Sequence, residues 1–301
     1  MRFIIYSTVA LLIAGNCCVL QAQCKSDNFS TLATALEAKN CARVLSLRIA
    51  KIESLGPEIG QLKRLTYLDL LKNDLQSLPA EICELKNLKQ LVLSENSLYE
   101  LPSAFGRLKA MEILQLDKNH LAEVPKSISQ LKKLTILDLS WNEFASLRED
   151  ICNLQSLSTF EIKHNHLLSL PEGIGRMQNM KTLALDYNRL TALPPGFVQL
   201  QQLVQLDVSH NQLQALPADI GKMKRLKVLS LSNNQLEKLP ASIGDLADLE
   251  MILLSNNNLQ SIPQEITKLK KLKTLVLLNN PIPAADIQAL KAALPGTQII
   301  F

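Results

Sequence analysis

Histidine, tryptophan and tyrosine side chains are the groups in this sequence best suited to chemistry or recognition near neutral pH. All four histidines and the only tryptophan lie between residues 120 and 210. Histidine acts as a general base or a metal ligand, whereas tryptophan and tyrosine serve as binding anchors. Four of these residues follow one another at steps of 23: Trp141, His164, Tyr187 and His210. A constant step predicts a repeated structural element that places them side by side.

The spacing of the histidines argues against a metal site or a nuclease site. His164 and His210 are two steps apart, which corresponds to ~10 Å between stacked strands and is too far for a shared metal ion. His164 and His166 together offer only a loose two-ligand site. The triplet His164-Asn165-His166 is similar to a nuclease motif, but Asn165 has a structural role in the repeat described below.

Other catalytic motifs are missing from the sequence. Gly221-Lys222 lacks the upstream glycine spacing and the following serine or threonine of a phosphate-binding loop. No Gly-x-Ser-x-Gly nucleophile motif occurs. We therefore expect a protein that is not an enzyme and that uses no cofactor or metal ion.

The composition is that of a folded protein with a predominantly aliphatic core. Apolar residues make up 47% of the 301 residues and charged residues 20%, whereas aromatic residues make up only 4%. The formal net charge of +4 is too small to indicate nucleic acid or an anionic membrane as the partner. A core dominated by one residue type suggests repeats.

A 23-residue repeat covers most of the chain. Eleven copies occupy residues 42–294 without insertion, and the last copy is modified. The second copy shows the template: Leu65, Leu68, Leu70, Asn73, Leu75, Leu78, Pro79, Ile82 and Leu85. One asparagine recurs in ten copies: Asn73, Asn96, Asn119, Asn142, Asn165, Asn188, Asn211, Asn234, Asn257 and Asn280.

Each part of the repeat predicts a local structure. Leu-x-Leu has a period of two and predicts a short strand with both leucines inward. The asparagine follows the strand, where its side chain can hydrogen-bond backbone groups of the turn and form a ladder between copies. Leu-Pro and Ile-x-x-Leu form the return limb. Since one coil cannot bury its own leucines, the copies must stack.

These residues resemble the leucine-rich-repeat family, in its 23-residue Leu-Pro-x-x-Ile-x-x-Leu subclass. The sequence is similar to plant intracellular Ras-group and Ras-scaffold repeat proteins and, because of its N-terminal segment, to exported bacterial repeat proteins. The resemblance implies an α/β repeat solenoid, an arc with a parallel concave sheet, that acts in protein interaction.

Both ends of the solenoid should carry caps. Residues 23–41 form the expected N-terminal cap, with a helix over 31–38 that Ser30 would cap. A helix over 284–294 and a terminal strand within residues 295–301 form the expected C-terminal cap.

The first 22 residues are typical of a secretory signal peptide. A basic start and an apolar run end near Ala22, after which we expect cleavage. An uncleaved membrane anchor, or a lipid attached to Cys17 or Cys24, is the alternative. No later segment is long and apolar enough to span a bilayer. Cys24 and Cys41 flank the first helix and are candidates for a disulfide in an exported protein.

The outward positions of the repeat define the candidate binding surface. Counted from the first leucine of each copy, position 8 holds Trp141, His164, Tyr187 and His210, and position 10 adds His120 and His166. Positions 5 and 7 place carboxylates on the same concave face: Asp117, Asp138, Glu161, Asp186 and Asp207. This acidic surface favours a basic or polar protein or peptide over nucleic acid.

Lysines gather instead at the ends of the return limbs: Lys63, Arg64, Lys86, Lys109, Lys132, Lys133, Lys224, Arg225, Lys270 and Lys271. They suggest an alternative, a surface-anchored adhesin or structural protein that binds through convex basic residues. We expect an exported module that binds a protein or peptide on its concave face, with no oligomeric state assigned.

Overall fold

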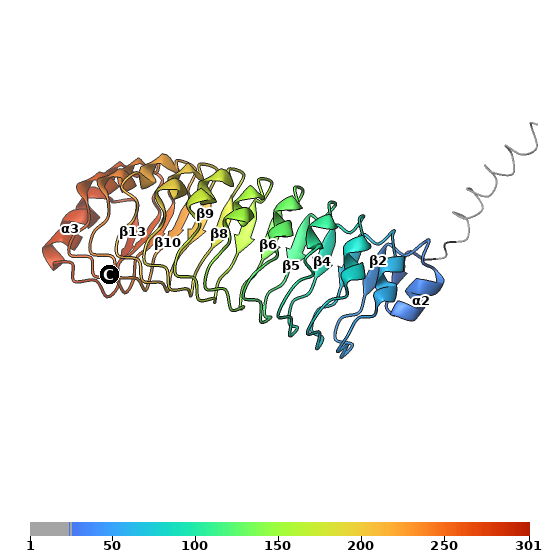
Figure 1. Cartoon of the computed structure of the whole chain (residues 1–301). Coiled ribbons are helices and arrows are strands. Elements are labelled where there is room, and N and C mark those ends of the chain that lie inside the picture. Colours follow the sequence, from blue (N-terminus) through green and yellow to red (C-terminus); the bar gives the residue numbers. More distant parts are fainter. Residues whose placement is uncertain (1–23, 25) are drawn as a thin grey trace, which may run out of the picture.

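The computed structural model describes residue 24 and residues 26–301, which form an open arc of stacked coils (Figure 1). In this part of the chain thirteen strands pair in chain order, from β1 to β13, as one parallel sheet. The predicted α/β repeat solenoid is confirmed. The predicted signal segment, residues 1–22, and Cys17 lie outside the described residues.

The strands are two or three residues long, and from β2 to β12 they recur every 23 residues. Their bounds are β1 (Asn28–Phe29), β2 (Val44–Ser46), β3 (Tyr67–Asp69), β4 (Gln90–Val92), β5 (Ile113–Gln115), β6 (Ile136–Asp138), β7 (Thr159–Glu161), β8 (Thr182–Ala184), β9 (Gln205–Asp207), β10 (Val228–Ser230), β11 (Met251–Leu253), β12 (Thr274–Val276) and β13 (Gln298–Ile300).

The return limb of each of the first ten coils contains one turn of 3-10 helix. A proline commonly precedes it and holds φ near −65°, as at Pro79, so that the chain enters the helix in an extended conformation. These helices span Pro57–Gln61, Ala80–Glu84, Phe105–Arg107, Lys126–Gln130, Glu149–Asn153, Glu172–Arg176, Pro195–Gln199, Ile220–Lys222, Ala241–Asp245 and Gln264–Lys268.

The core lies between the sheet and the return limbs. Leucines at positions 4 and 6, such as Leu137 and Leu139, are fully buried, whereas side chains at positions 3 and 5 alternate to the other face of the sheet. One continuous hydrophobic cluster runs from Ala35 to Leu294. Each coil is therefore stable only against its neighbours.

The repeated asparagines tie consecutive coils together. Asn142 shows the pattern: its Nδ2 donates to the carbonyl oxygens of Leu139 (3.1 Å) and, in the preceding coil, Leu116 (2.9 Å). Its Oδ1 accepts from the backbone N–H of Leu121 (2.9 Å). Equivalent bonds connect the other repeats and satisfy buried backbone groups at the turn after each strand.

Helices cap both ends of the arc. The N-terminal helix α2 (Leu32–Glu37) is capped by Thr31, whose hydroxyl accepts from the N–H of Thr34. The predicted cap at Ser30 is therefore wrong by one residue, because either hydroxyl fits the sequence pattern. Cys24 forms a disulfide with Cys41, with the two Cα atoms 5.6 Å apart.

At the other end, α3 (Ala284–Ala293) and β13 cover the last coil. The predicted helix forms and ends one residue earlier than expected, and the terminal strand forms within residues 295–301 as predicted. Among the described residues, no helix combines the length and the apolar character needed to cross a membrane.

Candidate functional site

Four aromatic side chains form a continuous stack beside the C-terminal ends of strands β6 to β9. We call Trp141, His164, Tyr187 and His210 the aromatic strip. Consecutive ring centroids are 3.6, 4.1 and 3.9 Å apart, and the ring planes differ by 9–11°. These distances are shorter than the ~4.8 Å between strands, so the rings are in face-to-face contact. The residues predicted from the 23-residue step are thus brought together.

The stack occupies a backbone position that most side chains avoid. Every described residue at position 8 from Ile49 to Asn279 has a left-handed φ, between 52° and 58°. Asparagine accepts this conformation readily, and Asn233, Asn256 and Asn279 occupy it in later coils. For tryptophan and tyrosine the same conformation costs about 1–3 kcal/mol each. Backbone preference therefore does not account for Trp141 and Tyr187.

On both sides of the aromatic strip, the column at position 8 continues with charged or amide side chains that contact one another. On the N-terminal side Lys118 forms an ion pair with Glu95 (2.8 Å). On the C-terminal side Asn233 contacts His210 Nε2 (3.0 Å), and Asn256 donates to Asn233 Oδ1 (2.8 Å). The 23-residue register places these residues next to one another, but it does not predict the contacts between their side chains.

The aromatic strip forms one side of a shallow, open hollow of about 550 Å³. The asparagine ladder contributes Asn119, Asn142, Asn165 and Asn188, and position 10 contributes Glu143 and His166. Trp141 is 50% exposed and Tyr187 44% exposed, so both remain accessible although their faces are stacked. Because neighbouring rings cover one another's faces within the stack, the strip exposes mainly its ring edges and polar atoms to solvent.

The two histidines predicted at position 10 have different surroundings. His120 stacks on Tyr99, with 5.2 Å between ring centroids, and its Nδ1 lies 3.0 Å from a carboxylate oxygen of Glu143. His166 lines the hollow and is exposed. Sequence reasoning missed Tyr99 and Glu143; their register at positions 12 and 10 was the available signal.

The predicted carboxylates lie on the strand face and do not line the hollow. Asp138 ends β6, Glu161 ends β7 and Asp207 ends β9, while Asp117 and Asp186 lie two residues beyond β5 and β8. Lys163 Nζ is 3.0 Å from a carboxylate oxygen of Glu161. Burial raises the pKa of Asp138 and of Asp186 above the ordinary aspartate value.

Within the strip, His164 is held in its neutral form. Burial between the neighbouring rings lowers its pKa, and the positive charge of Lys163 and the proximity of His210 act in the same direction. A neutral imidazole stacks between Trp141 and Tyr187 without bringing a charge into the hollow.

A second hollow, of about 740 Å³, lies on the return limbs and is partly basic. Lys63, Lys86, Arg107 and Lys109 line it together with Glu84, Asn87 and Cys83. Lys63 pairs with Glu84, and Lys109 donates to Gln130 (2.7 Å), so part of this basic charge is already engaged. Burial raises the pKa of the Cys83 thiol, which makes it a poor nucleophile.

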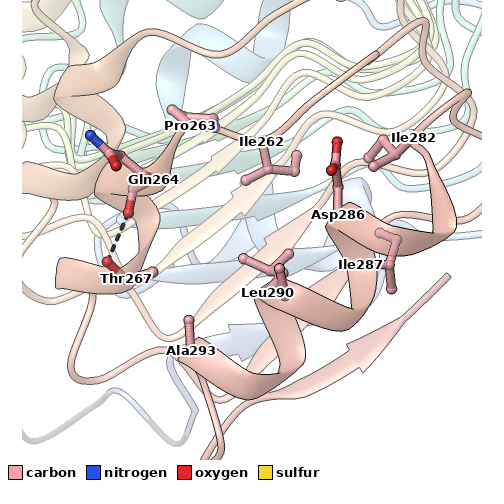
Figure 2. A pocket seen from close by; sticks show the side chains of 10 residues that line it. Ile262, Pro263, Gln264, Thr267, Ile282, Asp286, Ile287, Leu290 and Ala293 are labelled. Carbon is pink, nitrogen blue, oxygen red and sulfur yellow. Dashed lines mark hydrogen bonds between the residues drawn. The ribbon is translucent and has the colours of Figure 1, made fainter.

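A third hollow, of about 250 Å³, lies under the C-terminal cap (Figure 2). Ile262 faces Ile287 and Leu290 of α3 across it, with Asp286 as the charged residue of the lining. The Thr267 hydroxyl donates to the backbone oxygen of Gln264. An apolar lining with one carboxylate contains no catalytic pair. Across residues 24 and 26–301, no group of three or more histidine, cysteine or acidic residues is placed to hold a metal ion.

Comparisons with known proteins match the repeats along most of their length. Models described as a leucine-rich repeat region, leucine rich repeat and Leucine Rich Repeat match residues 146–234, residues 42–98 and 224–282, and residues 133–154, respectively. No curated protein sequence matches.

Solved structures are similar over nearly the whole arc. A leucine-rich-repeat protein of Leptospira interrogans is 30% identical over 88% of this chain and 85% of its own, with a TM-score of 0.63. The plant peptide hormone receptor RGFR1, solved in complex with RGF2, is 26% identical (TM-score 0.73); the match covers 84% of this chain but only 46% of the receptor chain.

An internalin from Listeria monocytogenes has the same fold, with 21% identity and a TM-score of 0.69 over 97% of this chain and 94% of its own. The repeat register, the stacked parallel sheet and these matches show that the chain belongs to the leucine-rich-repeat family.

Proposed function

We propose that this protein is an exported, non-enzymatic binding module that holds a protein or peptide partner along the aromatic strip. One observation carries the proposal: four stacked rings, two of them about half exposed, occupy left-handed backbone positions. The left-handed backbone is shared by the whole column, Ile49 and Lys118 included, so it is the stacking and the exposure of the rings that distinguish these four positions. Exposed tryptophan and tyrosine bury much area with a polar handle when a partner binds.

Similar structures support the class of partner. Two plant receptors similar to this chain were solved in complex with partners, RGFR1 with RGF2 and GASSHO1/SCHENGEN3 from Arabidopsis thaliana with CASPARIAN STRIP INTEGRITY FACTOR 2. The first of these is a plant peptide hormone receptor. The hollow beside the aromatic strip is shallow and open, which suits a polypeptide better than an enclosed small molecule.

Capture from surface and secreted protein extracts tests the proposal. The purified full chain is compared with the double variant Trp141→Ala/Tyr187→Ala and with the control Phe301→Ala, which removes an exposed aromatic at the C-terminal end of the arc. We expect a partner that wild type and the control retain and the folded double variant loses. Equal retention by all three would contradict the aromatic strip as the site. N-terminal sequencing of the recovered protein tests cleavage after Ala22.

The hollow formed by Lys63, Lys86, Arg107 and Lys109 favours a second candidate, an adhesin or structural protein that binds an anionic surface through its return limbs. Substitutions on each surface separate the two candidates, and contacts made by exposed lysines should in addition weaken as ionic strength rises. A partner whose binding is abolished by Lys86→Ala/Lys109→Ala and is insensitive to the aromatic substitutions would support this second candidate.

A further inference from the structure

The carboxylates beside the aromatic strip fall into two unpaired sets separated by an ion pair. We call Asp117, Asp138, Glu161, Asp186 and Asp207 the acid row; they belong to five consecutive coils. Glu161 is paired with Lys163, and in the described chain none of the other four has a lysine or arginine nitrogen within 4.0 Å. Asp117 and Asp138 therefore form one pair of adjacent acids, and Asp186 and Asp207 another.

These unpaired acids repel one another at a partly buried surface. For Asp138, burial raises the pKa and the charges of Asp117 and Glu161 add to the effect. For Asp186, burial again raises the pKa and the charge of Asp207 adds to it, whereas a backbone hydrogen bond and the charge of Lys163 partly offset this rise. The free protein thus bears an electrostatic cost at two places, and a cation at either place would reduce that cost.

A buried hydroxyl lies in the same row. Ser140 is 1% exposed and, at position 7, lies between Asp117 and Lys163 of the neighbouring coils. Its backbone N–H donates to Asp138, and its Oγ, although it meets no hydrogen-bond criterion in the described chain, lies close enough to the Asp138 carboxylate to lower its pKa.

Building on the proposed function, we propose that the partner is an extended basic polypeptide segment that crosses β5 to β9 and places one lysine or arginine against each acid pair. The centres of the two pairs are three coils apart, about 14 Å at the usual strand spacing. An extended chain rises about 3.4 Å per residue and alternates its side chains, so two basic residues four positions apart span this distance on one face.

The surroundings favour a polypeptide over other cations. The aromatic strip runs alongside the acid row, and the amide ladder of Asn233, Asn256 and Asn279 continues it with groups that can bond to a peptide backbone. The acids are spread over five coils, and no cluster suited to a metal ion occurs in residues 24 and 26–301. Nucleic acid would meet unpaired negative charge.

Selection from a displayed library of random linear dodecapeptides tests this chemistry. The baits are the full chain, the variant Asp186→Asn/Asp207→Asn and the control Glu172→Gln/Asp245→Asn, which removes two exposed acids from the return limbs. We expect wild type and the control to enrich peptides with two basic residues four positions apart. Enriched peptides, measured by fluorescence anisotropy, should bind the Asp186/Asp207 variant at least about tenfold more weakly.

The outcomes separate this inference from the proposed function. Enrichment without a basic pair, or peptides that bind wild type and Asp186→Asn/Asp207→Asn equally, would overturn the inference. If such peptides bind wild type but not Trp141→Ala/Tyr187→Ala, the inference about the acid row would fail and the aromatic strip would still be supported as the binding site. Basic peptides that need the acid row but ignore both aromatic substitutions would support the inference and contradict the strip.

Discussion

Replacing one asparagine in the middle of the ladder should destabilise the arc strongly. In Asn165→Ala four hydrogen bonds disappear: three from Nδ2, to the carbonyls of Leu139 (3.0 Å), Ile162 (3.2 Å) and Lys163 (3.2 Å), and one from the Phe144 N–H to Oδ1 (3.0 Å). Each of the three carbonyls keeps another donor, from Asn142, Asn188 and the Trp141 N–H respectively, so only the Phe144 N–H loses its sole side-chain acceptor.

The magnitude follows from this count. Each lost bond to a carbonyl that keeps a partner costs about 0.5–1 kcal/mol, and the orphaned buried N–H costs about 1–3 kcal/mol. We therefore expect Asn165→Ala to lower the free energy of unfolding by roughly 3 kcal/mol. Asn280→Ala is the matched control: Asn280 makes the same bonds at the end of the ladder, where water can replace them, so its loss should be about 1 kcal/mol.

Urea unfolding followed by circular dichroism measures both values, with hydrogen exchange at the Phe144 amide as a local readout. We expect a clearly lower urea midpoint for Asn165→Ala than for Asn280→Ala, and faster hydrogen exchange of the Phe144 amide in Asn165→Ala. Equal midpoints for the two variants, or an Asn165→Ala protein as stable as wild type, would show that the ladder does not carry this energy.

Three further predictions concern the ends and the charged surface. Cys24→Ser/Cys41→Ser should lower the stability of the N-terminal cap by about 3 kcal/mol, because it frees a 17-residue loop, and an unchanged thermal midpoint would contradict this. Asp186→Asn should raise the urea midpoint at pH 7 relative to wild type, because the raised pKa of Asp186 means that folding disfavours its ionised form. In acid, where Asp186 is protonated, the two proteins should have the same midpoint. A variant midpoint below that of wild type at pH 7 would contradict this. When the pH falls from 7.5 to 5.5, the free energy of unfolding of His164→Gln should decrease less than that of wild type. The reason is that the pKa of His164 is lowered in the folded protein, so the unfolded wild-type chain binds the proton more tightly. Equal decreases in the two proteins would contradict this.

The sequence predicted which residues are neighbours but not how their side chains meet. The 23-residue step placed Trp141, His164, Tyr187 and His210 in one column, because strand spacing converts a fixed step into adjacency. Their near-parallel stacking, and the left-handed backbone beneath them, depend on local torsion angles that residue types alone do not determine.

The same limit explains the residues that were missed. The contact between Tyr99 and His120 joins positions 12 and 10 of neighbouring coils, a diagonal relation that a search along single columns does not reveal. At the N-terminus the hydroxyls of Ser30 and Thr31 fit the capping pattern equally well, and only the backbone decides between them.

The affinity of a captured partner for strip variants tests the central claim most directly. Calorimetric titration would compare the wild-type chain, Trp141→Ala/Tyr187→Ala and the return-limb control Lys86→Ala/Lys109→Ala. If the aromatic strip is the binding site, the first variant should bind at least about 30-fold more weakly, as expected for two anchors worth roughly 1 kcal/mol or more each, and the control should stay within about twofold of wild type. An unchanged affinity in the aromatic variant, with a loss in the lysine variant, would contradict the claim and move the site to the return limbs.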